Sequence, residues 1–439
     1  MIGHNKKFSR LLVYVLNIVL LTMTYGWATM SYAQPVTPPQ LKLGNQSQLK
    51  LSASAQLWLR TTELNPGTTI QGETKDYVSD VSIRRFRMIL SGSITDRWYV
   101  KFQLGTNNLN YINNNSTLKI LDIETSYRFA DVFEIGGGKN AYVGLSRYAA
   151  PATSSALSYD CPLFTMPTVG ISDDLLRKFS LYAKGNIGHF AYRAVVARPL
   201  AVYQNTLSEE ANFYSNFPDL QYSAYLSYEF MDRESQTSAF KAGTYHGSKK
   251  IINLSVGFLY QEDALAGLDT QMDTISYDML LLAADFFMDL PLNNENSRSV
   301  TVYLGYFDYD FGKDYIRLSG ANNPSNGVRN GSYAGAGNSF PTTGTGQVAY
   351  LQLGYRTRIS PNEKLPYLQP YASIQVADYD GLNDQMIMYD YGLNFLFDGH
   401  RSKLTLAIQN RPIYSNQTRD YSQVTERMDM WILQYQFKI

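Results

Sequence analysis

The sequence predicts an all-β protein, a transmembrane antiparallel β-barrel of about 16 strands with short periplasmic turns and long extracellular loops. Three observations lead to this fold class. Segments of alternating apolar and polar side chains recur along the chain, as in strands that face lipid on one side and water on the other. Short and long connections alternate between these segments. No stretch after Ala33 has the roughly 18 consecutive apolar residues that a transmembrane helix needs.

The N-terminal region has the pattern of a Sec-type signal peptide. Three basic residues precede an apolar stretch over residues 11–21, and small residues flank a cleavage site after Ala33. A membrane-anchoring helix is the alternative, but the apolar stretch is too short to span a bilayer. We therefore expect a signal peptide over 1–33, followed by a flexible leader over 34–48 that contains proline and glycine.

The strands are expected to form one barrel domain over residues 49–439. The last strand is the clearest, because Trp431, Leu433 and Tyr435 fall on one face. One such strand also fits a soluble sheet, so the prediction depends on the repetition. The predicted strands cover residues 50–63, 80–95, 97–108, 117–130, 132–146, 178–186, 188–199, 220–231, 250–261, 275–289, 298–311, 345–359, 366–379, 385–398, 402–412 and 426–439.

One region is ambiguous in this strand assignment. An even number of strands returns both ends of the chain to the periplasm, where the short turns lie. Residues 239–245 could form another strand, but it would break the alternation of long and short connections. We therefore interpret residues 234–249 as a periplasmic connection.

One long loop is a candidate for the constriction of a pore. Long loops are predicted at residues 64–79, 146–177, 199–219, 312–344 and 413–425. The loop 146–177 is long enough to fold into a barrel of this size, which otherwise leaves a water-filled channel. A plain surface loop is the alternative. The charged candidates in it are Arg147, Asp160, Asp173 and Asp174, and its Cys161 is expected to be a buried, small apolar residue.

Basic side chains on the predicted inner face indicate a pathway for anions. The alternation directs Arg85, Arg87, Arg193, Arg356, Arg358 and Arg411 to the lumen, with Arg128 and Lys139 as further candidates. The register of Arg128 and Lys139 is less certain, because Gly136 to Gly138 can host a bulge. Guanidinium groups on a pore wall attract anions. The alternative is that they pair with lumenal carboxylates such as Asp122 and Glu124.

The composition and the histidines argue against other classes of function. Without the three basic residues of the signal peptide, 35 of the 38 Lys and Arg remain against 38 Asp and Glu, a net charge near −3 with no excess for nucleic acid. Cys161 is the only cysteine, so we expect no disulfide and no cysteine-based metal site. His189, His246 and His400 are scattered, and no Gly-x-Ser-x-Gly segment occurs. We expect no enzyme, no metal and no cofactor.

Several short motifs occur in an order that resembles the phosphate-selective porin O and P family, in the form common among Bacteroidetes. They are Ile83-Arg84-Arg85-Phe86-Arg87 with Gly92, the stretch from Gly136 to Lys139, Gln369-Pro370-Tyr371, Gln409-Asn410-Arg411-Pro412 and the ending Gln434-Tyr435-Gln436-Phe437. The resemblance covers essentially the whole mature chain. It implies a sixteen-stranded, homotrimeric porin with a basic lumen, in contact with outer-membrane lipid and lipopolysaccharide.

The resemblance has one departure. Well-studied members of the family pass anions along a ladder of arginines with a cluster of lysines at the constriction. The loop 146–177 has no lysine run, and only Lys178 follows it. Phosphate selectivity therefore does not follow from the resemblance.

The function expected from the sequence is passive diffusion of small hydrophilic solutes or ions, with a preference for anions. A plugged barrel with a structural or surface-interaction role is one alternative, and an outer-membrane hydrolase is another. Phe437 lies on the predicted lipid-facing row of the closing strand, beside the terminal Ile439. A C-terminal aromatic there resembles the signal for insertion of outer-membrane barrels, so we expect the barrel-assembly machinery as a partner.

Overall fold

The computed structural model describes residues 40–43, 47–113, 116–203, 206–293, 295, 297–360, 365–415 and 423–439. The expected signal peptide and the first part of the leader lie outside these residues. Residues 40–438 form one compact unit. No helix in the described part of the chain is long and apolar enough to cross a membrane.

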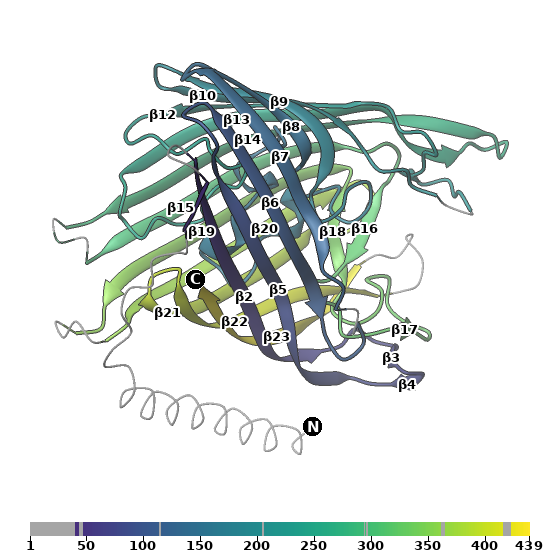
Figure 1. The fold of residues 1–439 in the computed structure, drawn as a ribbon. Helices are drawn as coiled ribbons and strands as arrows, with labels where there is room; N and C mark the ends of the chain where they lie inside the picture. The colour runs from purple at the N-terminus through teal and green to yellow at the C-terminus, as the bar shows by residue number, and fades with distance from the viewer. Residues whose placement is uncertain are drawn as a thin grey trace. The chain divides into compact units, whose positions relative to one another are not determined.

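The unit is a closed antiparallel barrel of sixteen strands, as the sequence predicts (Figure 1). The strands are β2 (Ser47–Glu63), β5 (Tyr77–Ser93), β6 (Trp98–Leu109), β7 (Lys119–Ala130), β8 (Phe133–Asn140), β9 (Lys178–Ile187), β10 (Phe190–Arg198), β12 (Gln221–Glu229), β13 (Ile251–Leu268), β14 (Thr274–Pro291), β15 (Ser299–Asp310), β19 (Gly346–Arg358), β20 (Tyr367–Tyr379), β21 (Met386–Asp398), β22 (Ser402–Ser415) and β23 (Gln423–Lys438).

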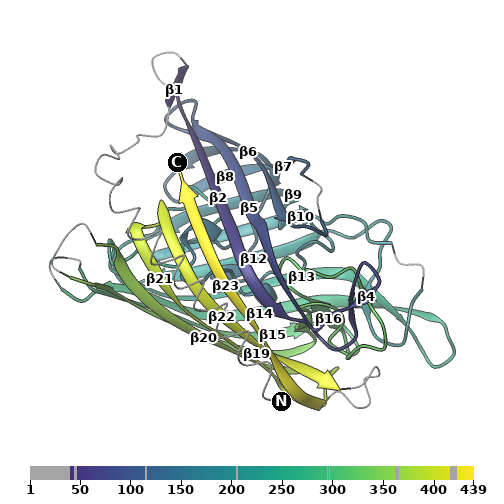
Figure 2. The same ribbon diagram turned by 90° about the horizontal axis from the view of Figure 1, so that it is seen from below.

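The first strand closes the ring. On β2, Ala55 lies opposite Phe86 of β5 on one side and opposite Phe437 of β23 on the other. Figure 2 shows β2 between these two neighbours. Closure pairs the backbone groups of both edge strands, so the barrel leaves no open edge.

Each of the sixteen predicted strands overlaps an observed one, and residues 234–249 form a connection with no strand, as expected. Two strand ends differ most: β13 continues to Leu268, seven residues beyond its predicted end at 261, and β8 ends at Asn140 and not at residue 146. Ala141, Tyr142 and Leu145, predicted in the strand, are buried beyond its end. Apolar residues bury equally well in a lumenal segment and in a strand, so their composition did not mark this boundary.

Short strands outside the ring complete the fold. β1 (Gln40–Leu43) pairs with the start of β2, so the second half of the predicted leader contains a strand. β11 (Asn212–Phe213) pairs with β13. β3 (Thr68–Ile70), β4 (Glu73–Thr74) and β17 (Gly327–Val328) form one small sheet, and β16 (Ile316–Ser319) pairs with β18 (Phe340–Gly344).

The two ends of the barrel differ in their connections. The turn end carries short turns, such as residues 94–97, 131–132 and 399–401. The loop end carries long connections, such as residues 141–177 and 311–345. The outer wall is apolar, and near the turn end it carries a group of exposed aromatic rings: Trp98, Tyr127, Phe129, Phe133, Phe190 and Phe230. Aromatic rings gather in this way where a barrel wall meets a membrane–water interface.

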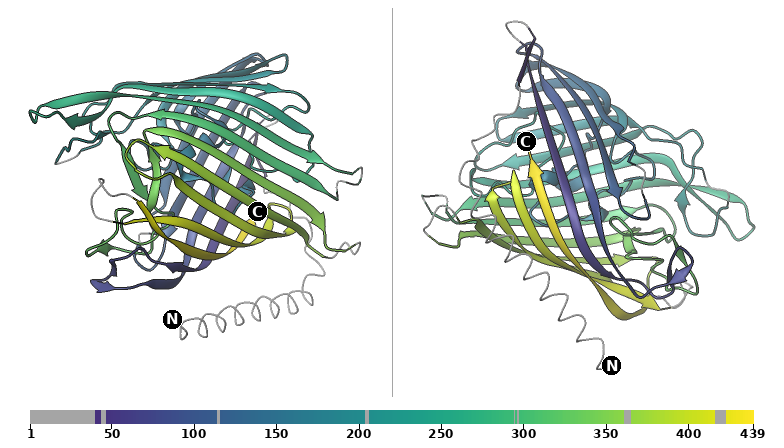
Figure 3. Two further views of the ribbon diagram at one scale, coloured as in Figure 1. Left: turned by 180° about the vertical axis from the view of Figure 1, so that it is seen from behind. Right: turned by 60° about the horizontal axis from the view of Figure 1, so that its bottom comes forward.

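The two halves of the inner wall differ in polarity. The wall formed by β13, β14, β15 and β19, seen from behind in Figure 3, carries a buried aromatic cluster that includes Phe287, Tyr303, Phe307, Tyr309 and Tyr350. The wall of β2, β5, β6 and β7, in front in Figure 1, buries charged and amide side chains instead, including Gln56, Arg85, Lys101, Asp122 and Glu124. A segment inserted into the lumen can therefore form an apolar core only with the wall of β13, β14, β15 and β19.

Candidate functional site in the barrel lumen

Two segments enter the lumen from opposite ends. The lumenal loop, residues 141–177, comes from the loop end, and the lumenal connection, residues 230–250, comes from the turn end. Backbone carbonyls of the lumenal loop accept hydrogen bonds from inward side chains of four strands, namely Gln56, Asn394, Lys403 and Gln436, at 2.8–3.1 Å. The loop thus lies inside the barrel, where the sequence placed a constriction candidate.

Backbone hydrogen bonds join the two inserted segments. Ala152 N donates to Lys241 O at 2.8 Å, and Lys241 N donates to Ala150 O at 3.0 Å. These two hydrogen bonds form a short parallel bridge between the lumenal loop and the lumenal connection. The backbone of each segment is therefore ordered partly by the other.

A buried ion pair reinforces the join. Arg147 donates from both terminal nitrogens to Glu234, at 2.7 and 2.8 Å, and its guanidinium lies 3.4 Å from the Phe287 ring centre. Tyr245 Oη also donates to Glu234, at 2.5 Å. Burial alone would raise the pKa of Glu234, but Arg147 and Lys241 outweigh it and hold that pKa well below its usual value.

A pair of stacked histidines fixes the connection at the turn end. The rings of His246 and His400 lie 4.0 Å apart, and His400 Nε2 is 3.0 Å from Thr244 O. Burial lowers the pKa of His400 to about 3, helped by the nearby Lys403. Burial and the adjacent His400 also lower the pKa of His246. Two neutral imidazoles therefore stack here at neutral pH.

Arg84 and Arg85 both enter the lumen because β5 has a bulge. The register with β2 shifts between Gln56, which faces Arg85, and Leu57, which faces Ile83, so Arg84 is the extra residue. Asp160 of the lumenal loop binds both arginines, at 2.8 Å from Arg84 and 2.5 Å from Arg85. Burial would raise the pKa of Asp160, but the two guanidiniums lower it overall, so the carboxyl stays ionised.

Arg87 differs from its neighbours on β5. Its guanidinium donates to the carbonyl oxygens of Phe86 and Thr106 and to Asn107 Oδ1, at 2.6–2.8 Å. No carboxylate of the described residues lies within ion-pair distance of it. Its charge is therefore solvated by neutral oxygens and is not neutralised.

Counted together, the cations of this wall outnumber the anions. Arg177 and Lys101 share Asp122, at 3.1 and 3.0 Å, and Lys101 lies 4.0 Å from Glu124. The five cations Arg84, Arg85, Arg87, Lys101 and Arg177 thus face the three carboxylates Asp122, Glu124 and Asp160, an excess of two positive charges.

A cavity of about 270 Å³ lies between this wall and the two inserted segments. The barrel wall contributes Ser54, Arg84, Arg85, Arg87, Ile89, Gln103, Asn107 and Lys438. The inserted segments contribute the apolar side chains of Leu163, Met166, Val169, Leu175, Leu176 and Phe240, together with Pro151, Ala152, Thr153, Ser154, Arg177 and Ser238. We call this space the basic cavity.

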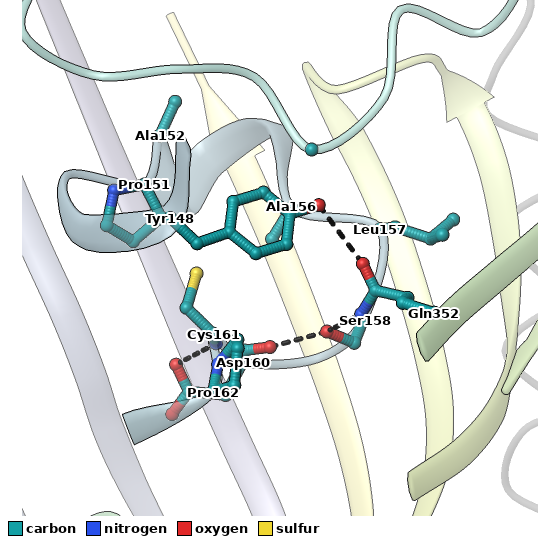
Figure 4. A pocket seen from close by; sticks show the side chains of 11 residues that line it. Tyr148, Pro151, Ala152, Ala156, Leu157, Ser158, Asp160, Cys161, Pro162 and Gln352 are labelled. Atoms are coloured by element: carbon teal, nitrogen blue, oxygen red, sulfur yellow. Dashed lines mark hydrogen bonds between the residues drawn. The ribbon is translucent and has the colours of Figure 1, made fainter. Parts of the chain in front are cut away.

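The tip of the lumenal loop is closely packed. Gln352 Nε2 donates to Ser158 Oγ at 3.1 Å, and Ser158 Oγ donates to Asp160 O at 2.5 Å (Figure 4). The space between these residues measures only about 10 Å³, which leaves no room for a solute. Burial raises the pKa of Cys161 to about 12, so its thiol stays protonated at neutral pH.

Three of the four remaining predicted inward arginines hold inserted or covering segments. Arg193 donates to Ala239 O at 3.0 Å, and Arg356 donates to His246 O at 3.0 Å. Arg358 lies at the turn end and donates to Tyr367 Oη at 2.8 Å. Arg411 is fully buried at the loop end and donates to Asn65 Oδ1 at 3.0 Å.

Two predicted lumenal residues require correction. Lys139 lies opposite Ile123 and Phe179, which are exposed on the outer wall, and the pairing of β8 with β9 has no bulge that could turn it inward. It binds Asp174 at 2.8 Å. Arg128 is exposed at the turn end, where it donates to Asp96 O at 2.8 Å, so it lies on the rim and not in the lumen.

The remaining candidates lie outside the basic cavity. Asp173 is buried and accepts from Thr168 Oγ1 at 2.9 Å, which stabilises the fold of the lumenal loop. Asp174 is partly exposed and also binds Lys119 at 3.1 Å. Phe437 lies on the outer face, with its ring centre 6.2 Å from that of Tyr435. Ile439 is exposed.

Sequence reasoning missed Arg84, Arg177 and Lys101. Strict alternation turns Arg84 to lipid, and no local signal in the sequence marks the bulge that reverses it. Arg177 closes the lumenal loop, and its contact with Asp122 spans two separate segments. Asp122 and Glu124 face the lumen, as predicted. The sequence did not show which cations these two carboxylates bind.

The barrel is similar to known porins, although no protein-family model and no curated protein matches the sequence. OmpF of Salmonella typhi, solved in complex with daunomycin, aligns with a TM-score of 0.53 at 10% identity, over 91% of this chain and 100% of that one. An anion-selective porin from Comamonas acidovorans aligns with a TM-score of 0.50 at 11% identity, over 90% and 100%. At this identity the likeness establishes a porin-like fold. Among the described residues, no group of three or more His, Cys, Asp or Glu could hold a metal ion.

Proposed function

We propose that this chain is an outer-membrane porin through which small anions diffuse along the basic cavity. The observation that carries the proposal is the excess of positive charge where β5, β6 and β7 meet the lumenal loop, inside a closed barrel with an apolar outer wall. A low-dielectric wall around such charges focuses their field and raises the local concentration of anions.

The division of the inner wall supports this path. The lumenal loop packs its aromatic side chains, among them Tyr148 and Phe164, against the cluster on the opposite wall. Because that half is filled, the space that remains lies beside the arginines. The turn end would face the periplasm and the loop end the exterior, with residues 1–33 removed on export. The family that the sequence resembles also suggests a homotrimer inserted by the barrel-assembly machinery.

Single-channel recording in planar bilayers tests the proposal. The purified barrel, placed between solutions of unequal KCl concentration, should give discrete conductance steps and a reversal potential of the sign set by chloride. A reversal potential of the sign set by potassium would refute the anion preference. It would leave the porin assignment in place.

A second candidate, a plugged barrel, is favoured by the buried Arg147–Glu234 pair. This pair ties together segments that enter from opposite ends, which narrows the lumen where they meet. Such a barrel would insert into the bilayer and resist heat, but it would give no conductance steps. The same recording therefore separates the two candidates.

A further inference from the structure

The two sides of the basic cavity differ in chemistry. One side offers the guanidiniums of Arg84, Arg85 and Arg87. The inserted segments contribute mainly apolar side chains, including Leu163, Met166 and Phe240, with three hydroxyl side chains and Arg177 among them. A ligand that satisfied both sides would need one anionic end and one apolar end.

From this asymmetry we infer that the basic cavity binds organic carboxylates with an apolar body, in preference to inorganic phosphate. The inference deepens the proposed anion pathway and rests on it for its role in transport. A carboxylate matches the planar fork of a guanidinium with two parallel hydrogen bonds. Inorganic phosphate carries oxygens on all sides, so those that face the apolar side would lose hydration without compensation.

The volume of the cavity agrees with a small organic acid. An apolar cavity of about 150 Å³ in another protein binds benzene. The basic cavity, at about 270 Å³, therefore has room for a benzoate-sized molecule and leaves space for water at the carboxylate end.

Among the guanidiniums, Arg87 is the one that binds no carboxylate of the described residues, and Lys438 is a further cation of the lining. Arg84 and Arg85 already share Asp160, and Arg177 binds Asp122. The partners of Arg87 are neutral oxygens, which a carboxylate can replace with a gain in charge–charge attraction. Arg87 is therefore the expected partner of the carboxylate, with Leu163 and Met166 beside the apolar body.

Equilibrium binding of benzoate and of inorganic phosphate to the full-length mature barrel in detergent tests the inference, with calorimetry as the readout. We expect benzoate to bind about tenfold more tightly than phosphate, because only benzoate buries apolar surface. Arg87→Gln should weaken both anions. Leu163→Asn should weaken benzoate more than phosphate. Arg128→Gln, on the rim, and Leu318→Asn, in the loop 311–345, are the matched controls and should change neither.

Equal or tighter binding of phosphate in the unaltered protein would overturn the inference, and so would a Leu163→Asn variant that keeps the benzoate-to-phosphate ratio. Binding in detergent does not need an open pore, so the result stands apart from the recordings above. A barrel that binds benzoate but shows no conductance would refute the porin proposal alone. A conducting barrel that prefers phosphate would refute this inference alone.

Discussion

Arg147 and Glu234 face each other inside the barrel through two hydrogen bonds of 2.7 and 2.8 Å, although one belongs to a segment from the loop end and the other to a segment from the turn end. The pair is buried, so water cannot hydrate either charge if its partner is removed. Residues 230–250 therefore narrow the lumen together with residues 141–177.

Breaking this pair should loosen the constriction. In Glu234→Ala the Arg147 guanidinium stays buried without its carboxylate, a change that costs about 3–5 kcal/mol in comparable buried pairs. We expect a lower unfolding temperature and larger, noisier single-channel conductance, because the two segments lose the ion pair that links them. Bilayer recording and thermal unfolding followed by circular dichroism measure the two effects.

Lys313→Ala is the matched control for this variant. Lys313 forms an exposed ion pair with Glu209 at 3.4 Å, and exposed pairs contribute little to stability. Both measurements should therefore stay close to those of the unaltered protein. If Glu234→Ala conducts like the control, the two segments do not restrict the pore jointly.

Acid should weaken the attachment of the connection at the turn end. The pKa of His400 is about 3 in the folded barrel and near 6.5 when unfolded, so between these values the unfolded state binds a proton that the folded state does not. The contribution of this site to the free energy of unfolding is thus fully present above about pH 6.5 and is lost as the pH falls toward 3. Limited proteolysis of residues 230–250 across this range measures the release.

His400→Phe separates the histidine effect from general acid unfolding. A phenyl ring can still stack on His246 but cannot take up a proton, so proteolysis in this variant should depend less on pH. His189→Phe, at a turn away from the inserted segments, should retain the full dependence. Identical pH profiles for the two variants would contradict the role of His400.

The closing strand gives a test of assembly. Phe437→Asp places a charge on the outer face of β23, near the turn end, where the direct cost of a charge facing lipid is about 0–1 kcal/mol. We expect a larger fall in the yield of heat-modifiable barrel in cells than in refolding from urea, because recognition of the C-terminus acts only in cells. Thr425→Asp, near the other end of β23, is the control, and an equal loss in both variants would argue against a terminal signal.

The sequence predicts the barrel well because alternation is a local signal. Trp431, Leu433 and Tyr435 turn to lipid whatever lies elsewhere in the chain, and the same rule places Arg85 and Arg87 inside. It fails for Arg84, because a bulge changes the register without a distinct local pattern. The contact of His246 with His400 was also beyond prediction, since it depends on a connection folding inward over a distant turn.

The candidate site was predictable in its residue types but not in its pairings. Both readings of the lumenal arginines, attraction of anions and neutralisation by carboxylates, occur within the same strand. Arg85 binds Asp160, whereas Arg87 binds neutral oxygens only. Arg85 and Arg87 lie two residues apart on the same face of β5, yet only Arg85 has a carboxylate partner. That partner, Asp160, belongs to the lumenal loop, and the pattern of residues in the strand does not predict the path of this loop.

The pairings of Arg85 and Arg87 lead to different expectations for two matched variants. Arg84 and Arg85 share the single carboxylate of Asp160, so these three groups together carry one net positive charge. Arg85→Gln and Arg87→Gln therefore each remove one charge from the excess of two, and both should shift the reversal potential in a KCl gradient toward cation preference. The shift should shrink at 1 M salt, where the screening length falls to about 3 Å. Arg85→Gln also loses an ion pair and should lower stability by about 1–3 kcal/mol, whereas Arg87→Gln, whose partners are neutral oxygens, should lower it less. An unchanged reversal potential in both variants would mean that the electrostatic account of this wall is wrong.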